Sequence, residues 1–219
     1  KISGYLKRKF LIKTDFLRSK KKFYLEKKDR NKFTNFDESF LKKNFDDIVF
    51  LEGHFESPKY FNAYENEIKN EFRFKDELEF KNSSLFKEID KSNSVGVCIR
   101  QNRFSEGKGK NTQINKIKSE TYSNEQINYI NKSSKFIINK FPDAKFFLWS
   151  NDLSSLKKEN IKFDINIIDL SKYKNHFDIR AFNLFLLSSC KHFIVTPSTF
   201  NWWGAWLSKN DEKIVTRPA

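Results

Sequence analysis

Short apolar runs alternate with helical patterns along the second half of this 219-residue chain, and this alternation limits the fold more than any other feature. The expected strands are residues 95–99, 145–149, 164–168, 193–196 and 213–215. The expected helices are residues 123–140, 152–159, 178–190 and 199–207, the first opening on a capping box of Ser123 and Gln126. Strands and helices that alternate at this spacing predict an α/β fold, with a parallel sheet covered by helices on both faces.

The first half of the chain carries weaker signals. Residues 1–45 are rich in Lys and Phe without clear periodicity, and residues 47–51 form a short apolar run that predicts a strand. Ser57 followed by Pro58 is typical of a helix start, because proline fits the first helical turn.

A division between two domains is expected near residue 91. Residues 74–89 have a helical pattern, and the polar run at 91–94 has the composition of a linker. The sequence therefore predicts one domain over residues 1–91 and a second over residues 92–219.

The carboxyl ends of the expected strands carry the residues that point to a ligand. Ligands of parallel sheets bind beyond these ends. Arg100 and Arg103 follow the strand at 95–99, where a guanidinium can hold a diphosphate through two parallel hydrogen bonds. A pair of surface arginines is the alternative.

Ser198 and Thr199 stand where an expected strand runs into an expected helix. A helix start presents free backbone N–H groups and hydroxyls, which suits a phosphate, although simple capping of the helix is the alternative. Trp202, Trp203 and Trp206 follow at helical spacing, which predicts that they pack in the core.

Asn183 lies among apolar neighbours on the expected helix 178–190. A buried amide must be hydrogen-bonded, so it either bonds a backbone carbonyl or binds the edge of a base. Cys98 and Cys190 lie in apolar segments, with no second Cys or His at zinc-site spacing. They are expected to be buried free thiols of a reducing compartment, and no metal site is predicted.

Basic residues outnumber acidic ones by 42 to 28, a formal net charge of +14. Such a surplus suits anionic partners or, alternatively, a solvated lysine-rich surface. A nucleic-acid-binding module is not recognisable, so nucleic acid is the less favoured partner. No apolar stretch reaches the roughly 18 residues that span a bilayer. The chain has neither a start Met nor a signal core, so it is expected to begin inside a longer protein.

Several of these segments, in this order, resemble the bacterial α-1,2-fucosyltransferases (glycosyltransferase family 11). The similarity runs from about residue 48 to the end of the chain. The matching segments are Leu51-Glu-Gly-His-Phe-Glu-Ser-Pro-Lys-Tyr-Phe61, Cys98-Ile-Arg-Gln-Asn-Arg-Phe104, Phe147-Leu-Trp-Ser-Asn-Asp152, Cys190-Lys-His192 and Ser198-Thr-Phe-Asn-Trp-Trp-Gly-Ala-Trp-Leu207.

The chain also departs from the family's motifs. Cys98 stands for the family's His, Gln101 for its second Arg, Asn102-Arg103 for its Gly-Asp and Asn183 for a helix acid. The family's glycine-rich start and its tail are missing, so the sequence is expected to be incomplete at both ends.

The resemblance implies a GT-B-like fold of two Rossmann-like domains across a cleft. Residues 1–91 would be part of the acceptor-side domain, and residues 92–219 the C-terminal domain that binds the nucleotide sugar. The implied reaction is inverting, metal-independent transfer of L-fucose from GDP-fucose to a hydroxyl of a glycan acceptor, with an α-1,2 linkage. Other readings are a GT-B transferase for another nucleotide sugar and a non-catalytic basic binding protein.

Site residues carry over position by position. The resemblance assigns Arg100 to the β-phosphate, Cys98 and Asn183 to positions that contact guanine, and Thr199, beside Ser198, to phosphate. Glu106, in the loop after the arginine motif, is the expected general base. His54 and Glu56 are rivals for that role, while Asp152 is expected to cap a helix.

The implied partners are a nucleotide sugar and a glycan acceptor, not nucleic acid. The implied location is the cytoplasm, with a peripheral contact to the anionic surface of the inner membrane. The implied process is the synthesis of a surface glycan.

Overall fold

The computed structural model describes residues 23–26, 36–45, 49–53, 55, 57–107, 109–174 and 178–218. The chain forms two compact units, Lys1–Glu71 and Phe72–Ala219.

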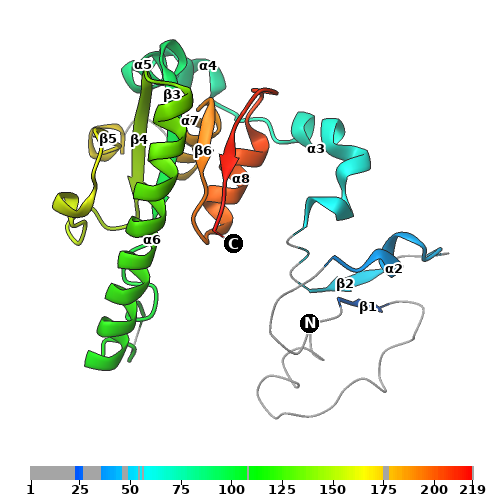
Figure 1. The fold of residues 1–219 in the computed structure, drawn as a ribbon. Coiled ribbons are helices and arrows are strands. Elements are labelled where there is room, and N and C mark those ends of the chain that lie inside the picture. The colour runs from blue at the N-terminus through cyan, green and yellow to red at the C-terminus, as the bar shows by residue number, and fades with distance from the viewer. Residues whose placement is uncertain are drawn as a thin grey trace. The chain divides into compact units, whose positions relative to one another are not determined.

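The described part of the N-terminal unit contains a two-stranded parallel sheet and short helical segments (Figure 1). Its elements are β1 (Phe23–Leu25), α2 (Glu38–Leu41), β2 (Phe50–Glu52), the 3₁₀ helices η2 (Pro58–Tyr60) and η3 (Asn62–Tyr64), and α3 (Glu65–Glu71). The strand predicted at 47–51 overlaps β2 at Phe50 and Leu51, and residues 46–48 lie outside the described residues. Ser57 accepts a hydrogen bond from the Lys59 N–H at 3.4 Å, so the predicted helix start is confirmed, although the helix is a 3₁₀ turn.

Aromatic rings and buried acids hold this unit together. Tyr24, 4% exposed, packs against Phe40 and donates a hydrogen bond to the Asp37 carboxylate. The Tyr60 hydroxyl donates to Glu26 Oε1 at 3.1 Å. Burial and the bond to Asp37 raise the pKa of Tyr24 to about 12, so this phenol stays protonated at neutral pH.

The C-terminal unit is built on a five-stranded parallel sheet in the order β5-β4-β3-β6-β7 (Figure 1). The strands are β3 (Asn93–Ile99), β4 (Ala144–Ser150), β5 (Ile165–Ile167), β6 (His192–Ile194) and β7 (Val215–Thr216). Their order runs outward from β3 in both directions, as in the Rossmann fold, so the direction of winding reverses between β3 and β6. The predicted α/β class and parallel sheet are confirmed.

Helices cover both faces of this sheet. One apolar cluster contains Phe147, Phe182 and Phe193 and joins the sheet to α4 (Glu77–Asn82), α5 (Ser84–Lys91), α7 (Ile179–Ser188) and α8 (Thr199–Leu207). The other contains Val97, Leu148 and Ile130 and joins it to α6 (Gln113–Lys140). Strand residues alternate between the two clusters, as expected for strands buried on both faces.

Glycines let α7 approach the sheet closely, at Gly96, and let α8 approach α7 closely, at Gly204. A β-carbon on Gly96 would lie 2.8 Å from Leu187, and one on Gly204 would lie 2.5 Å from the same side chain. Leu187 is fully buried, so it fills the space that these two glycines leave open.

The start of α6 corrects the sequence-based prediction. The helix begins at Gln113, where Thr112 accepts a hydrogen bond from the Asn115 N–H at 3.3 Å. Ser123 and Gln126 are therefore buried inside the helix rather than at its cap. A capping-box pattern is local, so it does not reveal that these polar side chains bond the end of a strand instead.

Three other element predictions also need correction. The helix expected at 74–89 is broken at Ser83, whose hydroxyl caps α5 by accepting from the Phe86 N–H at 3.1 Å. The expected linker at 91–94 contains the start of β3. The helix expected at 152–159 is replaced by turns and η4 (Lys158–Asn160).

The boundary between the compact units follows Glu71, twenty residues before the predicted division at 91. α4 and α5 belong with the C-terminal sheet because Phe80, fully buried, packs on Phe182 and Phe185. The acceptor-side and donor-side roles of the two domains stay predictions.

The tryptophans of α8 are half-buried rather than core residues. The helix buries Asn201, Gly204, Ala205 and Leu207 instead. Trp202 and Trp206 stack on each other with an interplanar angle of 8°. The helical spacing correctly groups the tryptophans, but it places them on the flank of the helix, beside the face that touches the core.

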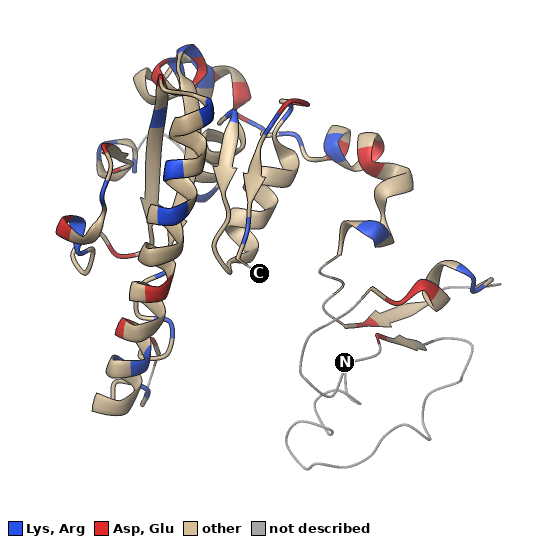
Figure 2. Ribbon diagram, in the orientation of Figure 1, with Lys and Arg blue, Asp and Glu red and all other residues tan. Residues whose placement is uncertain are grey.

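Lys and Arg are interspersed with Asp and Glu over the described helices (Figure 2). Within the described residues, no helix combines the length and the apolar character needed to cross a membrane.

Candidate functional site

The carboxyl edge of the C-terminal sheet opens between β3 and β6. Their pairing ends at Val97 and Ile194, whereas the pairing of β3 with β4 continues to Ile99 and Ser150. In parallel sheets the ligand crevice lies where the winding reverses, and here that is the β3–β6 gap.

The connection from β6 to α8 lines this gap. The Thr196 hydroxyl donates to the Cys98 carbonyl at 2.8 Å and so holds the connection against β3. α8 then begins at Thr199, with Ser198 as the residue before it. The Ser198 side chain makes no capping hydrogen bond, and the first N–H groups of a helix have no partner within the helix. This terminus can therefore receive an anion.

Arg100 is held at the end of β3 by a side chain of α6. Gln126 accepts from the Arg100 N–H at 3.0 Å and donates to the Arg100 carbonyl at 3.0 Å. Gln126 is 4% exposed, so this pair of buried hydrogen bonds stabilises the main chain from which the guanidinium projects.

The Arg100 guanidinium forms an ion pair with Glu106. Asn151, which follows β4, donates to the other Glu106 oxygen at 2.9 Å. The side chains of Arg100 and Glu106 are 35% and 37% exposed, so a ligand can reach both. The residues predicted to bind phosphate and to act as a base are thus in direct contact.

Tyr122 connects Arg100 to the start of α8. Its hydroxyl donates to the Pro197 carbonyl at 3.1 Å. On α6, Tyr122 lies one turn before Gln126, whose Nε2 donates both to the Tyr122 carbonyl at 3.2 Å and to the Arg100 carbonyl at 3.0 Å. Arg100 and the segment before Ser198 therefore border the same part of the edge.

Of the two positions assigned to guanine, Cys98 faces the side of the sheet that α7 covers, and Asn183 lies on α7 itself. Cys98 is 6% exposed within the apolar cluster there, and burial raises the pKa of its thiol. Asn183 is half-buried on α7, and its Oδ1 is buried with no hydrogen-bond partner among the described residues. Guanine contact by either residue stays a prediction.

The remaining candidates differ in outcome. Asp152 accepts from the N–H of Ser154 at 3.0 Å and of Ser155 at 3.3 Å, so its role is structural as predicted, but it caps a turn and not the expected helix. Hydrogen bonds from these serines lower the pKa of Asp152 to about 2. His54 and Glu56 lie outside the described residues.

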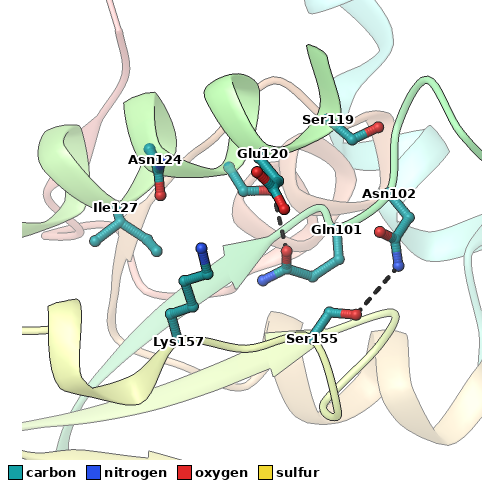
Figure 3. A pocket seen from close by; sticks show the side chains of 9 residues that line it. Gln101, Asn102, Ser119, Glu120, Asn124, Ile127, Ser155 and Lys157 are labelled. Atoms are coloured by element: carbon teal, nitrogen blue, oxygen red, sulfur yellow. Dashed lines mark hydrogen bonds between the residues drawn. The ribbon is translucent and has the colours of Figure 1, made fainter. Parts of the chain in front are cut away.

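Two adjoining cavities lie at the β3–β4 end of the edge. The first, of about 220 Å³, is lined by Gln101, Asn102, Ser119, Glu120, Ser123, Asn124, Ile127, Ser155 and Lys157 (Figure 3). The second, of about 400 Å³, is lined by Asn102, Ser105, Glu106, Asn111, Lys116 and Glu120. Among the predicted site residues, Glu106 lines the second cavity, whereas Arg100, Asn183 and Thr199 line neither of these two.

Asn102 explains one departure from the family's motif. It has a positive φ of 55°, a conformation that asparagine adopts more readily than most residues with a side chain. Asparagine can therefore stand where the family has glycine. Its Nδ2 donates to Asp152 Oδ2 at 2.8 Å, which fixes the wall shared by the two cavities.

In the part of the chain that the structure describes, no group of three His, Cys, Asp or Glu side chains is arranged to hold a metal ion.

Comparisons with known proteins agree with the motifs. The chain is 50% identical over 38 residues to the O-antigen biosynthesis glycosyltransferase WbnK of Escherichia coli, which covers 17% of this chain and 13% of that protein. It is 27% identical over 127 residues to an alpha-1,2-colitosyltransferase of Escherichia coli, covering 58% of this chain and 40% of that protein. The chain thus spans less than half the length of these relatives. The family model of glycosyl transferase family 11 matches residues 7–218, and the chain belongs to this family.

Proposed function

We propose that the chain is part of an inverting glycosyltransferase that moves L-fucose from GDP-fucose to a hydroxyl of a glycan acceptor, forming an α-1,2 linkage. The observation that carries the proposal is that Arg100 directly follows β3 while α8 begins just after β6, the neighbouring strand, so that both stand at the carboxyl edge where the winding of the sheet reverses. Two positive groups at one crevice suit the diphosphate of a nucleotide sugar. Colitose is a second candidate donor sugar, because a relative is an alpha-1,2-colitosyltransferase.

The leaving diphosphate gains negative charge as its bond to the sugar breaks. Arg100 and the α8 N-terminus, with the hydroxyls of Ser198 and Thr199, would stabilise that charge in the transition state. Because Glu106 already pairs with Arg100, an arriving diphosphate would compete for the guanidinium. The Glu106 carboxylate would then be available, next to the donor, to accept the proton of the attacking hydroxyl.

Asn183 supports the choice of guanine. Its Oδ1 needs a donor, and guanine offers N–H groups along one edge. A carboxylate at this position could accept two of them with charge assistance, which roughly doubles the strength of such bonds. Asn183→Asp should therefore raise the preference for GDP over ADP, measured by calorimetric titration of each nucleotide. An unchanged ratio would remove Asn183 from the guanine pocket.

Metal-independent transfer is part of the proposal, since protein cations are available to the diphosphate. Product formation measured with and without excess EDTA should be equal. We also propose that residues 1–71 belong to the acceptor-side domain of a GT-B architecture.

The main test is GDP binding by Arg100 variants. Arg100→Lys keeps the charge but loses the fork of N–H donors, and Arg100→Ala loses both. Loss of a charge-assisted bond of about 1.5–3 kcal/mol predicts about 10- to 100-fold weaker binding for Arg100→Ala. Arg180→Lys, at a side chain that is 93% exposed, is the matched control and should bind like the parent. If Arg100→Ala binds GDP as tightly as the parent, the donor assignment is wrong.

A further inference from the structure

Gln101 carries a buried polar group that nothing in the described protein satisfies. The residue is 4% exposed, and its Oε1 accepts from the Ser123 hydroxyl at 3.0 Å. Its Nε2, with two N–H groups, has no hydrogen-bond partner among the described residues. An unpaired buried donor costs about 1–3 kcal/mol, so its retention indicates a partner that binds there.

The orientation of Gln101 is fixed. Its N–H donates to Asn151 Oδ1 at 2.7 Å, and its carbonyl accepts from Asn151 Nδ2 at 3.3 Å. With main chain and Oε1 both held, the amide nitrogen is aimed into the 220 Å³ cavity, toward Lys157 (Figure 3). A water molecule needs only about 10–15 Å³ of such space, so the cavity has room for a much larger ligand.

The cavity offers hydrogen-bond donors and acceptors together. Lys157 points its ammonium between Asn124 and Gln101, and Glu120 adds a carboxylate (Figure 3). Within the described residues, the side chains of Lys157, Asn124 and Glu120 form no hydrogen bond or ion pair. A simple anion would face the carboxylate, whereas sugar hydroxyls both donate and accept. This mixture suits a neutral sugar.

The cavity also lies in the right place for a second substrate. It borders the β3–β4 end of the edge, one strand away from the crevice where a diphosphate is expected. Asn102 and Glu120 also line the 400 Å³ cavity, which reaches Glu106. A continuous polar path thus runs from Lys157 to the carboxylate that pairs with Arg100.

We propose that these two cavities form a subsite for the acceptor glycan. The smaller cavity binds a neutral sugar ring through Gln101 Nε2, Lys157 and Glu120, and the larger one leads the adjoining sugar toward Glu106. The inference rests on the proposed function, because it assigns the acceptor of that reaction to a site separate from the donor.

Side-chain amide signals test the site directly. In nitrogen-15 spectra of the full chain, the Gln101 NH₂ pair is assigned by its loss in Gln101→Met. Neutral disaccharides ending in galactose, glucose, mannose or N-acetylglucosamine are then titrated separately, as is GDP. At least one disaccharide should shift the Gln101 signals while GDP leaves them unchanged. A response to GDP alone, or to none of these probes, would overturn the proposal.

Kinetics with variants give a second test. Gln101→Met keeps the side-chain length but removes the donor, and should raise the acceptor KM by about 3- to 10-fold, as expected for loss of a neutral hydrogen bond. Lys157→Met should act in the same direction, while its neighbour Lys158→Met, outside the cavity, is the matched control. The KM for the donor should not move in any of the three.

A melting curve shows whether Gln101→Met folds. If it folds poorly, Lys157→Met and Lys158→Met, at two exposed residues, still test the subsite. An acceptor KM unchanged in Lys157→Met, or raised equally in Lys158→Met, contradicts the subsite. Failure of the donor assignment is separable, since it would appear as normal GDP binding by Arg100→Ala while the disaccharide titration stands by itself.

Discussion

The two halves of the carboxyl edge are built differently. On the β4 side, strand pairing runs to Ile99, and side-chain amides then continue it, with Asn151 bonding both main-chain groups of Gln101. On the β6 side, pairing stops at Val97, and the hydroxyl of Thr196 makes the next bond to β3. The first half is closed by hydrogen bonds, and the second is left open.

This difference separates two kinds of chemistry. The open half exposes a guanidinium and a helix terminus, which suit a charged ligand. The closed half fixes neutral amides and hydroxyls around two cavities, and such groups select a ligand by the geometry of its hydrogen bonds. A transferase needs both, one for the leaving diphosphate and one for the hydroxyl-bearing acceptor.

The largest expected effect on stability comes from the clamp, the pair of hydrogen bonds by which Gln126 holds the Arg100 N–H and carbonyl. Gln126→Leu would leave the Arg100 N–H unpaired and its carbonyl with only the 3.5 Å bond from the Ser123 hydroxyl, and an unpaired group costs about 1–3 kcal/mol when buried. Urea unfolding should show a loss of about 2–4 kcal/mol, together with weaker GDP binding. Asn128→Leu, an exposed amide on the same helix, should change stability by less than about 0.5 kcal/mol. Equal losses in the two variants would mean that the clamp contributes nothing.

The residues of the open half were foreseeable from the sequence, whereas in the closed half the sequence indicated Glu106 and a structural Asp152 but not the two cavities. Arg100, Ser198 and Thr199 stand directly after apolar runs, and parallel topology brings such positions to one edge. The spacing of Ser123 and Gln126 fits a helix start, but in the structure both side chains bond the main chain of Arg100. A pattern of spacing along the chain cannot distinguish these two roles. Their true role depends on α6 starting at Gln113, and the exposed Ile114 and Ile117 give that first part no core-facing periodicity.

Spacing along the chain predicted where the strands lie, but it did not predict which face of α8 is buried. The apolar runs placed all five strands of the C-terminal sheet within a few residues. The tryptophans of α8 were expected in the core, yet the close approach at Gly204 turns a neighbouring face of the helix inward. That approach depends on Leu187, which lies on a different helix, so no local pattern reports it.

Gly204→Ala tests how tightly the open half is packed. The added methyl would lie 2.5 Å from Leu187, and overpacking of a core costs about 1–3 kcal/mol. Thermal unfolding should therefore move to lower temperature. In the double variant with Leu187→Val, part of the loss should be recovered because the smaller side chain makes room. Strictly additive losses would show that the two residues do not collide.

Thr196→Val tests the hydroxyl that bridges β6 to β3. The change keeps the shape but removes the donor to the Cys98 carbonyl and the acceptor of the 3.3 Å bond from Asn201 Nδ2, so we expect a loss of about 1–2 kcal/mol in urea unfolding. Thr216→Val is the matched control, since its Oγ1 is buried with no partner among the described residues. That substitution should be neutral or stabilising. A similar loss at both positions would contradict a specific bridge at Thr196.

The smallest expected effect concerns the amino end of the same β3–β6 junction. His192 Nδ1 accepts from the Ile214 N–H at 3.1 Å, so Nε2 carries the proton and donates to Asn93 Oδ1, also at 3.1 Å. The neutral ring therefore links β6 to both of its neighbours, and protonation of Nδ1 would break the bond to Ile214. Burial, followed by the charges of Lys140 and Lys191, lowers the pKa of His192 from its ordinary value of 6.5.

Because the folded state binds this proton less readily than the unfolded chain, stability should be complete above pH 6.5 and should fall as the pH drops below it. Carboxylates titrate near pH 4, so urea unfolding between pH 7.5 and 5.5 isolates the histidines. His192→Gln should unfold more easily at pH 7.5 and should show a shallower dependence on pH, since it lacks the ring whose protonation breaks the bond to Ile214. If the parent and the variant lose stability in parallel over this range, folding does not lower the pKa of His192. The neutral ring would then not be what stabilises the amino end of the β3–β6 junction.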